Sequence, residues 1–257
     1  MNSENSIVNS MQEKRDEIKA LLTRLRLPSF KETFIAQTED PNSPLEPFED
    51  RLLNCLRNEV DVRQSKKISR SIAAAHLRFP GASIDQKIYD PERLLNTALI
   101  EKPAQAEWLN GEYSLIITGK TGCGKSYLAC ALAVSAIRKG YSAYYTRCND
   151  FQRECDRIIG TEEASTLFRT MTKCDLLVLD DFGLMRLGMD ACKTLLDIID
   201  CRYEHKATII TSQFPVSAWS ELFPDQTLAN ACLDRLSRKS YRIPMDGPSL
   251  RPNDIIQ

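Results

Sequence analysis

Apolar residues recur at helical spacing in the first part of the chain. Ile18, Leu21, Leu22 and Leu25 lie three or four positions apart, or side by side on one helical face, which predicts an amphipathic helix. Pro28 closes that segment, because proline cannot continue a helix interior. The first segment is therefore predicted to be helical, with no strand signal.

Prolines mark the next change of pattern. The three prolines between residues 39 and 47 predict a loop. A new helix is expected from Phe48 to about Val60, followed by a second helix, or a continuation, to about Leu77. The residues 79–81, Phe-Pro-Gly, stop it. Farther on, Asp90-Pro91-Glu92 offers a helix N-cap, an N1 proline and an early acid, so one more helix is expected there.

After Gly111 the pattern changes to short apolar runs that alternate with amphipathic stretches. The runs cover residues 113–118, 142–146, 176–179, 208–211 and, more weakly, 240–243. Alternating strands and helices predict an α/β fold with a largely parallel sheet that is covered on both faces. The chain is thus expected to comprise a helical N-terminal domain over residues 1–80, a connector over 81–110 and an α/β domain over 111–257.

Composition narrows the function classes. The chain has 34 Lys and Arg against 35 Asp and Glu, so it lacks a polycationic tail, although a local basic face stays possible. No run of 18 apolar residues predicts a membrane span, and the polar N-terminus lacks the apolar core of a signal peptide, so a cytoplasmic location is expected. Nine scattered cysteines without a CxxC pair, and only two histidines, argue against zinc and disulfides and for reduced, mostly buried thiols.

The strongest chemical signal is a glycine-rich loop between an apolar run and a helical stretch. It matches G-x-x-x-x-G-K-[ST] in full, and its residues are Gly119, Lys120, Thr121, Gly122, Cys123, Gly124, Lys125 and Ser126. Glycines let backbone amides curve around phosphates, and the helix N-terminus adds positive potential. Lys125 is predicted to contact the β- and γ-phosphates of ATP and Ser126 to bind Mg²⁺.

Two acids end the apolar run at 176–179. A buried strand that ends in Asp180 and Asp181 is costly unless the acids meet a cation. Asp180 is therefore the expected Mg²⁺ ligand, and Asp181 the acid that polarises the attacking water. At the end of the next run, Gln213 is the preferred residue to orient that water, with Thr211 and Ser212 as alternatives and an ordinary strand-to-loop turn as the rival interpretation.

Arg235 lies on a predicted helix after the fourth apolar run. An arginine there could reach the γ-phosphate of a neighbouring subunit and neutralise charge that develops during hydrolysis. Judged by residue type alone, a salt bridge or a solvated side chain explains Arg235 better.

A basic segment lies near the end of the helical domain. Residues 63–78 contain five Lys or Arg and no acid; these are Arg63, Lys66, Lys67, Arg70 and Arg78. Arg63, Lys67 and Arg70 share one helical face, opposite an apolar stripe, which suits contact with DNA phosphates. Judged by the residues alone, a solvated charged face is the better interpretation. The segment offers no pattern for reading bases, so any DNA binding is expected to be indifferent to sequence.

Taken together, these motifs resemble the IstB-like helper ATPases of bacterial insertion sequences, AAA+ proteins close to the DnaC-type helicase loaders. The resemblance covers nearly the whole chain and is carried by residues 25–28, 76–80, the phosphate loop, 175–183, 210–216, 224–236 and 247–251. The Asp-Asp-Phe-Gly and Thr-Ser-Gln-Phe-Pro-Val stretches are its most specific parts.

The resemblance implies an ATPase that helps a DDE transposase. Such a protein binds duplex DNA, forms homo-oligomers on it with ATP, and assists target selection and strand transfer. Its parallel five-stranded sheet has the order 5-1-4-3-2, behind a small all-α N-terminal domain that binds DNA. By the same resemblance Asp180 is the Mg²⁺ acid, Asp181 the catalytic acid, Gln213 the sensor and Arg235 the arginine finger.

The chain departs from the broader AAA+ pattern at three points. Asp181 replaces the usual glutamate and Gln213 the usual asparagine, which predicts slow hydrolysis rather than lost ATP binding. Most of the helical lid is missing, since about 14 residues follow Ile243, with Arg251 as a possible stand-in for its arginine. A replicative helicase loader, a small-molecule kinase and a nucleotide-dependent scaffold that barely hydrolyses ATP remain alternatives.

Overall fold

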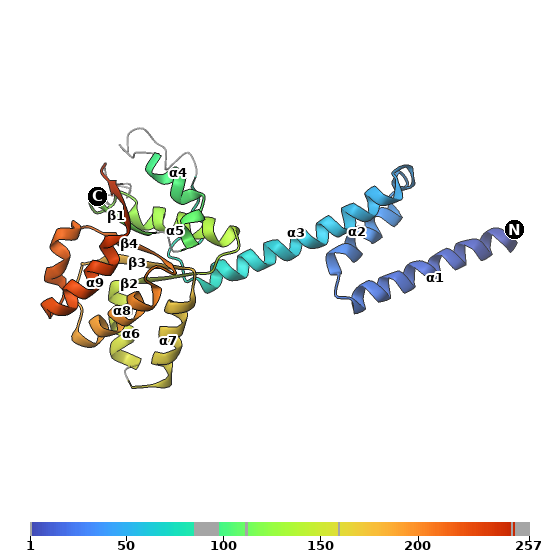
Figure 1. The fold of residues 1–257 in the computed structure, drawn as a ribbon. Helices are drawn as coiled ribbons and strands as arrows, with labels where there is room; N and C mark the ends of the chain where they lie inside the picture. Colours follow the sequence, from blue (N-terminus) through green and yellow to red (C-terminus); the bar gives the residue numbers. More distant parts are fainter. Residues whose placement is uncertain (1, 85–97, 111–112, 159, 248, 250–257) are drawn as a thin grey trace, which may run out of the picture. The chain divides into compact units, whose positions relative to one another are not determined.

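The computed structural model describes residues 2–84, 98–110, 113–158, 160–247 and 249 (Figure 1). Contacts divide the chain into two compact units, residues 1–69 and 70–257, so the boundary falls inside one long helix. The sequence placed this boundary at residue 80. The difference arises because residues 75–82 pack on the second unit, where Ala75, Leu77 and Ala82 are buried and the Ala75 carbonyl accepts a hydrogen bond from the Tyr145 amide.

Helices make up the regular structure of the first unit. They are α1 (Asn2–Arg24), α2 (Pro28–Glu39), the 3₁₀ turn η1 (Ser43–Leu45) and α3 (Phe48–Ala74). Pro28 opens α2 as well as ending the preceding segment, because the first position of a helix needs no amide hydrogen. Of the two alternatives for residues 61–77, a second helix or a continuation, the structure has the continuation, since no proline or glycine interrupts that stretch.

The core of the first unit is small and includes a buried acid. Leu22, Phe30 and Cys55 are buried together. Beside them lies Glu59 of α3, only 4% exposed, whose carboxylate accepts hydrogen bonds from the Phe30 amide at 2.9 Å and the Arg63 Nε at 2.6 Å. Burial opposes ionisation of Glu59, but these hydrogen bonds outweigh it and lower its pKa. Leu27, the N-cap residue of α2, has no side-chain acceptor for the first amides of that helix. Glu59 of α3 supplies the missing acceptor and thus caps α2.

We expect Glu59→Gln to destabilise the packing of α2 on α3 by about 1–3 kcal/mol at neutral pH, since a buried charged acceptor is lost. Amide hydrogen exchange in the full-length protein measures this as faster exchange in α2. The lowered pKa means that the stabilisation is present above the ordinary glutamate pKa and is lost as the pH falls through the folded-state value. The matched control is Glu46→Gln, at an exposed acid; equal exchange in the two variants would contradict the capping role.

The second unit is built on a parallel sheet of five strands. Its strands are β1 (Ser114–Gly119), β2 (Ala143–Arg147), β3 (Leu176–Phe182), β4 (Ala207–Ser212) and β5 (Ser240–Met245), in the order β2-β3-β4-β1-β5. This confirms the predicted sheet and its order. All strands point the same way, so their carboxyl ends meet at one edge.

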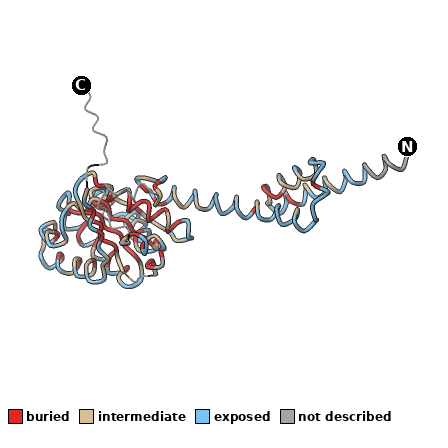
Figure 2. The backbone as a smooth tube through the Cα atoms, turned by 90° about the horizontal axis from the view of Figure 1, so that it is seen from above, coloured by how far each residue is buried: buried red, intermediate tan, exposed pale blue. Residues whose placement is uncertain are grey.

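Helices cover both faces of the sheet (Figures 1 and 2). They are α4 (Ala98–Ala104), α5 (Lys125–Arg138), α6 (Cys148–Ile158), α7 (Glu162–Lys173), α8 (Met189–Arg202) and α9 (Gln226–Arg238), with the 3₁₀ turns η3 (Glu107–Asn110) and η4 (Val216–Leu222). α5 packs on β1, β3 and β4, and α4 packs on α5. Leu177 and Leu179 face the other side and share a core with α6, α8 and α9.

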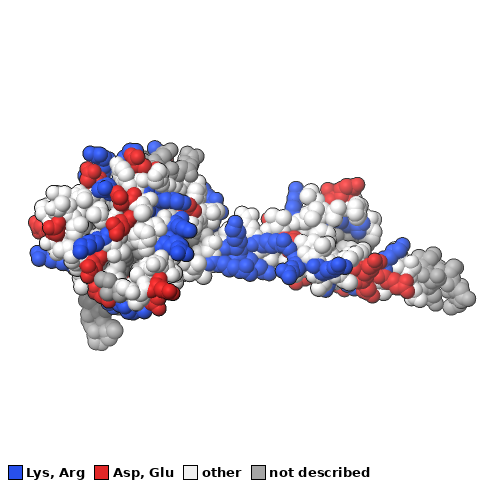
Figure 3. Space-filling model, turned by 60° about the horizontal axis from the view of Figure 1, so that its bottom comes forward, with Lys and Arg blue, Asp and Glu red and all other residues white. Residues whose placement is uncertain are grey.

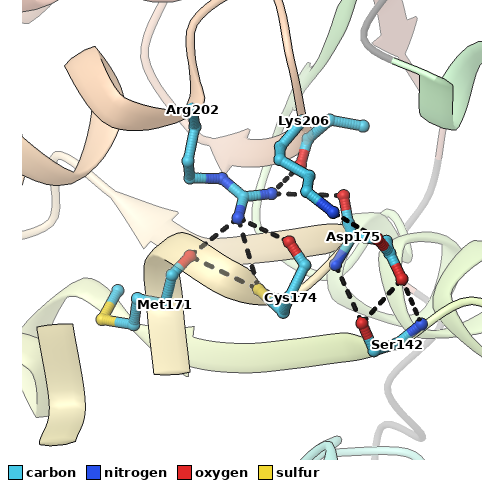
Figure 4. Close-up of polar contacts among 7 residues, drawn as sticks. Ser142, Met171, Cys174, Asp175, Arg202 and Lys206 are labelled. Atoms are coloured by element: carbon cyan, nitrogen blue, oxygen red, sulfur yellow. Dashed lines mark hydrogen bonds and ion pairs between the residues drawn. The ribbon is translucent and has the colours of Figure 1, made fainter. Parts of the chain in front are cut away.

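A buried arginine holds the amino ends of the strands together (Figure 4). Arg202 is 1% exposed, and its guanidinium donates to the carbonyls of Met171 and Cys174 at 2.7 and 2.8 Å. It also donates to the carbonyl of Asp175, the residue just before β3, and to that of Ala207, the first residue of β4. Burial lowers the pKa of Arg202, and the carbonyl oxygens offset that cost. The strand ends opposite the phosphate loop are thereby fixed.

Residues 75–82 form a short extension on the edge of the sheet. The His76 ring packs edge-on against Tyr144 of β2, with 5.7 Å between centroids, and Phe79 packs against Tyr127 of α5 at 5.8 Å. The Ser83 amide donates to the Tyr127 hydroxyl at 3.4 Å. These contacts attach the chain that leaves α3 to the outer strand β2 and to α5, the helix that follows the phosphate loop.

Three further expectations meet the structure here. Eight of the nine cysteines are buried and Cys201 is exposed. Across the described parts of the chain, no helix combines the length and the hydrophobicity that crossing a membrane would require. The helix expected to begin at Asp90 lies outside the described residues.

Candidate nucleotide site

The glycine-rich loop joins β1 to α5 at the carboxyl edge of the sheet. Gly122 and Gly124 have φ values of +88° and +95°, which side chains other than glycine rarely adopt. Gly124 is the N-cap of α5, so the first amides of this helix face the loop. At Gly119 a Cβ would lie 2.1 Å from the Met245 carbonyl oxygen, so close packing against β5 also requires glycine there. The loop has the form of a phosphate cradle.

Lys125 is the buried cation of the loop. It is 6% exposed, and its ammonium donates to the carbonyls of Gly119 and Lys120 at 2.7 and 2.8 Å. The side chain therefore curls over the loop, where an anion in the cradle would meet it. Lys120 instead points outward, 81% exposed, at 3.6 Å from an oxygen of Asp246.

Asp180 is a buried carboxylate surrounded by hydroxyl groups. It has no exposed surface, and its Oδ1 accepts hydrogen bonds from Ser126 Oγ at 2.8 Å and from Thr211 Oγ1. Its Oδ2 accepts from the Tyr145 hydroxyl at 2.5 Å. The structure thus brings together Ser126 and Asp180, the two predicted Mg²⁺ ligands, although 54 positions separate them in the sequence.

Asp181 lies at an irregularity in the pairing of β3 with β4. Its φ is +58°, and its amide donates to Thr211 Oγ1 at 3.0 Å, so one threonine hydroxyl contacts both acids. Such bulges re-aim a side chain, here to place Asp181 differently from Asp180. Burial and the neighbouring Asp180 raise the pKa of Asp181, whereas Arg78, Arg147 and Lys125 lower it.

The end of β4 separates the three candidates for the sensor. Gln213 Oε1 accepts a hydrogen bond from Thr121 Oγ1 of the phosphate loop at 2.6 Å. Thr211 points to the two acids. Ser212 points away from the site: its hydroxyl donates to the Phe182 carbonyl at 2.7 Å and accepts from the Trp219 indole at 3.2 Å. Gln213 therefore faces the loop, Thr211 faces the acids, and Ser212 supports the strand.

Arg235 lies at the opposite edge of the sheet from the phosphate loop. It lines a small pocket with Ser114 and Thr208, residues at the amino ends of β1 and β4. Its Nε is 2.5 Å from Asp200 Oδ1, and a second guanidinium nitrogen donates to the Ala231 carbonyl at 2.9 Å. Since β1 is six residues long, about 20 Å of strand separate the two edges. Arg235 cannot contact a phosphate in the loop of its own subunit.

The basic segment lies mainly on α3, and Figure 3 shows Lys and Arg side chains gathered along that helix. Lys66, Lys67 and Arg70 are exposed. Arg63 is partly engaged inside the first unit, where it binds Glu59 and the Arg26 carbonyl. Arg78 is exposed but belongs to the second unit, near enough to Asp181 to lower the pKa of that acid. Arg251 lies outside the described residues.

The residues at this edge fit a nucleotide with Mg²⁺. No cluster of three His, Cys, Asp or Glu that could hold a metal occurs among the described residues, so the protein offers no metal cage of its own there. Mg²⁺ needs none, because it is bound through one or two carboxylates together with phosphates and water. Asp180 and Ser126 supply hard oxygen ligands beside the cradle, and Lys125 supplies a cation for the phosphates.

Sequence reasoning missed two contributors to this site. Tyr145 and Arg147 lie on β2, and their side chains share one face of the strand because they are two residues apart. Arg147 pairs in register with Asp180. Their position at the carboxyl end of a predicted strand was the available signal. The sequence does not show which other strand lies beside that strand in the sheet, so the contact with Asp180 could not be predicted.

The fold and this site together define a phosphate-loop nucleotide-binding protein with an AAA+-like core. Similar solved structures are those of DnaI, with a TM-score of 0.58, and of the DnaC helicase loader, with a TM-score of 0.55. Each is 22% identical to this chain; the matches cover 69% and 66% of it, and 94% and 99% of the respective structures. These likenesses show the fold.

Sequence comparison then identifies the family. The model of the IstB-like ATP binding protein family matches residues 20–256, and the chain belongs to this family. An insertion sequence ATP-binding protein of Sinorhizobium fredii, y4pL, is 39% identical over 77% of this chain and 80% of its own length. The ATP-binding protein of insertion sequence IS1162 from Pseudomonas fluorescens is 34% identical over 76% of this chain and 85% of its own. The predicted family is confirmed.

We expect Ser212→Ala to lower the free energy of unfolding by about 1–3 kcal/mol, because the Phe182 carbonyl and the Trp219 indole lose a buried partner. Nucleotide affinity should stay within about twofold of the wild type, since the hydroxyl faces away from the loop. Thermal denaturation and nucleotide titration measure the two effects. Ser237→Ala, which removes a hydroxyl bonded only within helix α9, serves as the control. A large loss of nucleotide affinity without destabilisation would make Ser212 part of the nucleotide site.

Proposed function

We propose that this insertion-sequence ATP-binding protein is an ATP-dependent, DNA-binding helper of a DDE transposase. In this proposal it forms oligomers on duplex DNA when ATP is bound, and it assists target selection and strand transfer. ATP hydrolysis loosens the assembly. The observation that carries the proposal is the separation of the phosphate loop and Arg235 to opposite edges of one sheet, in a chain of the IstB-like family.

Within one subunit, the proposed steps use the residues at the carboxyl edge. Backbone amides of the loop and the Lys125 ammonium bind the β- and γ-phosphates. Ser126 and Asp180 would hold Mg²⁺, which supplies charge neutralisation at the phosphates when bound. Asp181 polarises the attacking water, helped by the raised pKa that makes it a better proton acceptor. Gln213, already bonded to the loop through Thr121, orients that water.

The γ-phosphate would join two subunits. Because Arg235 cannot reach the loop of its own chain, it can act only on a neighbour, after exchanging its contact with Asp200 for the phosphate. An assembly held by that contact multiplies weak DNA contacts through effective concentration. When hydrolysis releases the γ-phosphate, the contact between subunits is lost and DNA binding weakens.

We expect Lys125→Ala to weaken ATP binding by about 10- to 100-fold, since a charge-assisted contact with the phosphates is removed. ATP-dependent oligomerisation and DNA binding should fall with it. Analytical ultracentrifugation and fluorescence anisotropy of labelled duplex DNA, each with and without ATP, measure these effects. Lys173→Ala, which removes an exposed lysine of α7, is the control. Undiminished oligomers and DNA binding in Lys125→Ala would defeat the ATP-gated scheme.

DNA contact is proposed for Arg63, Lys66, Lys67, Arg70 and Arg78. Four of them lie on α3, all five have exposed side chains, and the segment contains no acid to oppose a phosphate backbone. Contacts with phosphates alone give affinity without base preference. Arg78 would bring one such contact close to Asp181, and so close to the nucleotide.

Replacing Lys66, Lys67 and Arg70 by alanine is expected to reduce the slope of log K against log salt by about 3, because each lost phosphate contact contributes about 0.9. DNA titrations between 50 and 200 mM salt, with ATP present, measure the slope on two unrelated duplexes. The matched control replaces Arg169, Lys173 and Lys193, three exposed basic residues of α7 and α8, by alanine. An equal change of slope in both variants would show that net charge, rather than the α3 surface, sets DNA affinity.

The partner distinguishes this proposal from a helicase loader. The fold is shared with the DnaI and DnaC structures, and every residue of the nucleotide site would serve either task. The similar proteins from Sinorhizobium fredii and Pseudomonas fluorescens are named for insertion sequences, which favours the transposase. Affinity capture with the transposase and with a replicative helicase, each purified, separates the two partners.

A further inference from the structure

Asp180 is held by three hydroxyl groups, and one of them comes from a strand that phosphate-loop motifs do not include. We infer that Tyr145 is a positioning residue for the Asp180 carboxylate, which it holds in the orientation that receives Mg²⁺ with the nucleotide. This inference rests on the proposed function, because it assigns the support of the same metal-binding acid. Tyr145 would touch neither the nucleotide nor the metal.

The backbone of Tyr145 is held in place by a hydrogen bond to the segment that follows α3. Its residue is 6% exposed, and its backbone amide donates to the Ala75 carbonyl at 2.9 Å, so β2 is anchored on its outer edge at this residue. Tyr145 pairs in register with Val178, two residues before Asp180. The ring therefore reaches diagonally along the sheet toward the carboxyl edge, and its hydroxyl meets Asp180 Oδ2 at 2.5 Å.

The two oxygens of Asp180 have different partners. Ser126 and Thr211 donate to Oδ1, and Tyr145 donates to Oδ2. Hydrogen bonds on Oδ1 alone would let the carboxylate rotate about its bond to Cβ, whereas a donor on each oxygen fixes its plane. Metal ligands are commonly oriented in this way by groups that do not themselves touch the metal. Without the Tyr145 hydroxyl, Asp180 Oδ2 would lose this hydrogen bond while remaining buried, which is energetically costly for a charged oxygen.

Arg147 lies beside Tyr145, two residues further along the same face of β2. The Tyr145 hydroxyl has a single proton, which it donates to Asp180 Oδ2. The guanidinium of Arg147 offers no competing acceptor for that proton, because it can only donate.

The competing explanation is that Tyr145 only fills space in the core. The adjacent Tyr144 allows the two to be separated, because successive residues of a strand face opposite sides of the sheet. Tyr144 packs against His76 and the core formed by α6 to α9. Replacing either tyrosine by phenylalanine removes one hydroxyl group from β2, but only the hydroxyl of Tyr145 contacts Asp180.

The test is Tyr145→Phe in the full-length protein, with Tyr144→Phe as the matched control. Binding of a fluorescent ATP analogue is titrated with Mg²⁺ at fixed nucleotide concentration, and again in EDTA without Mg²⁺. We expect Tyr145→Phe to raise the half-saturating Mg²⁺ concentration about tenfold, the loss typical of one hydrogen bond to a charged group. Affinity for the nucleotide without Mg²⁺ should stay unchanged, and kcat should fall more than KM rises.

Each other outcome decides against a stated claim. An unshifted Mg²⁺ dependence, or an equal shift in Tyr144→Phe, overturns the positioning role of Tyr145. A uniform loss of nucleotide binding with and without Mg²⁺ means that Tyr145 supports the fold, and also overturns it. If the wild-type protein itself takes up no nucleotide in the presence of Mg²⁺, the proposed function fails instead. Circular dichroism fixes a temperature at which all three proteins are folded, and the titrations are made there.

Discussion

The Asp180 carboxylate lies at the carboxyl end of β3 and has no exposed surface. The rest of the site depends on the protein groups that stabilise this buried charge. Water cannot stabilise the charge of Asp180, so Ser126, Thr211 and Tyr145 must do so. These hydroxyls come from α5, β4 and β2. The requirement to satisfy one charge therefore fixes the relative positions of the helix that begins at the phosphate loop and of three neighbouring strands.

The direction of the strands gives the molecule two chemically different edges. At the carboxyl edge the loop, the two acids and Gln213 converge. At the amino edge Arg202 binds the carbonyls that precede β3 and begin β4, and Arg235 pairs with Asp200. A parallel sheet cannot bring the two edges together, because its strands are rigid and about 20 Å long. A site that needs groups from both edges needs a second copy of the chain, which is why we connect ATP with assembly.

The segment after α3 packs beside the nucleotide site within the second unit. Residues 75–82 hydrogen-bond to β2 and pack on α5, and Arg78 lies close enough to affect Asp181. The strand that this segment borders is the one that carries Tyr145 and Arg147. Arg78 is therefore the member of the basic segment that lies beside the acids.

The sequence by itself determined the class of fold, the phosphate loop and the family, because these depend on local periodicity and on residues close together in the chain. The alternation of strands and helices and the spacing from Gly119 to Ser126 are properties of single segments. The boundary at residue 70 and the capping of α2 by Glu59 were not visible, since they depend on which segments pack together. The same holds for the separate orientations of Thr211, Ser212 and Gln213, and for the contact of Tyr145 with Asp180. Burial of a charge selects its partners by distance in space, and only the tertiary structure brings residues 126, 145, 180 and 211 to one point.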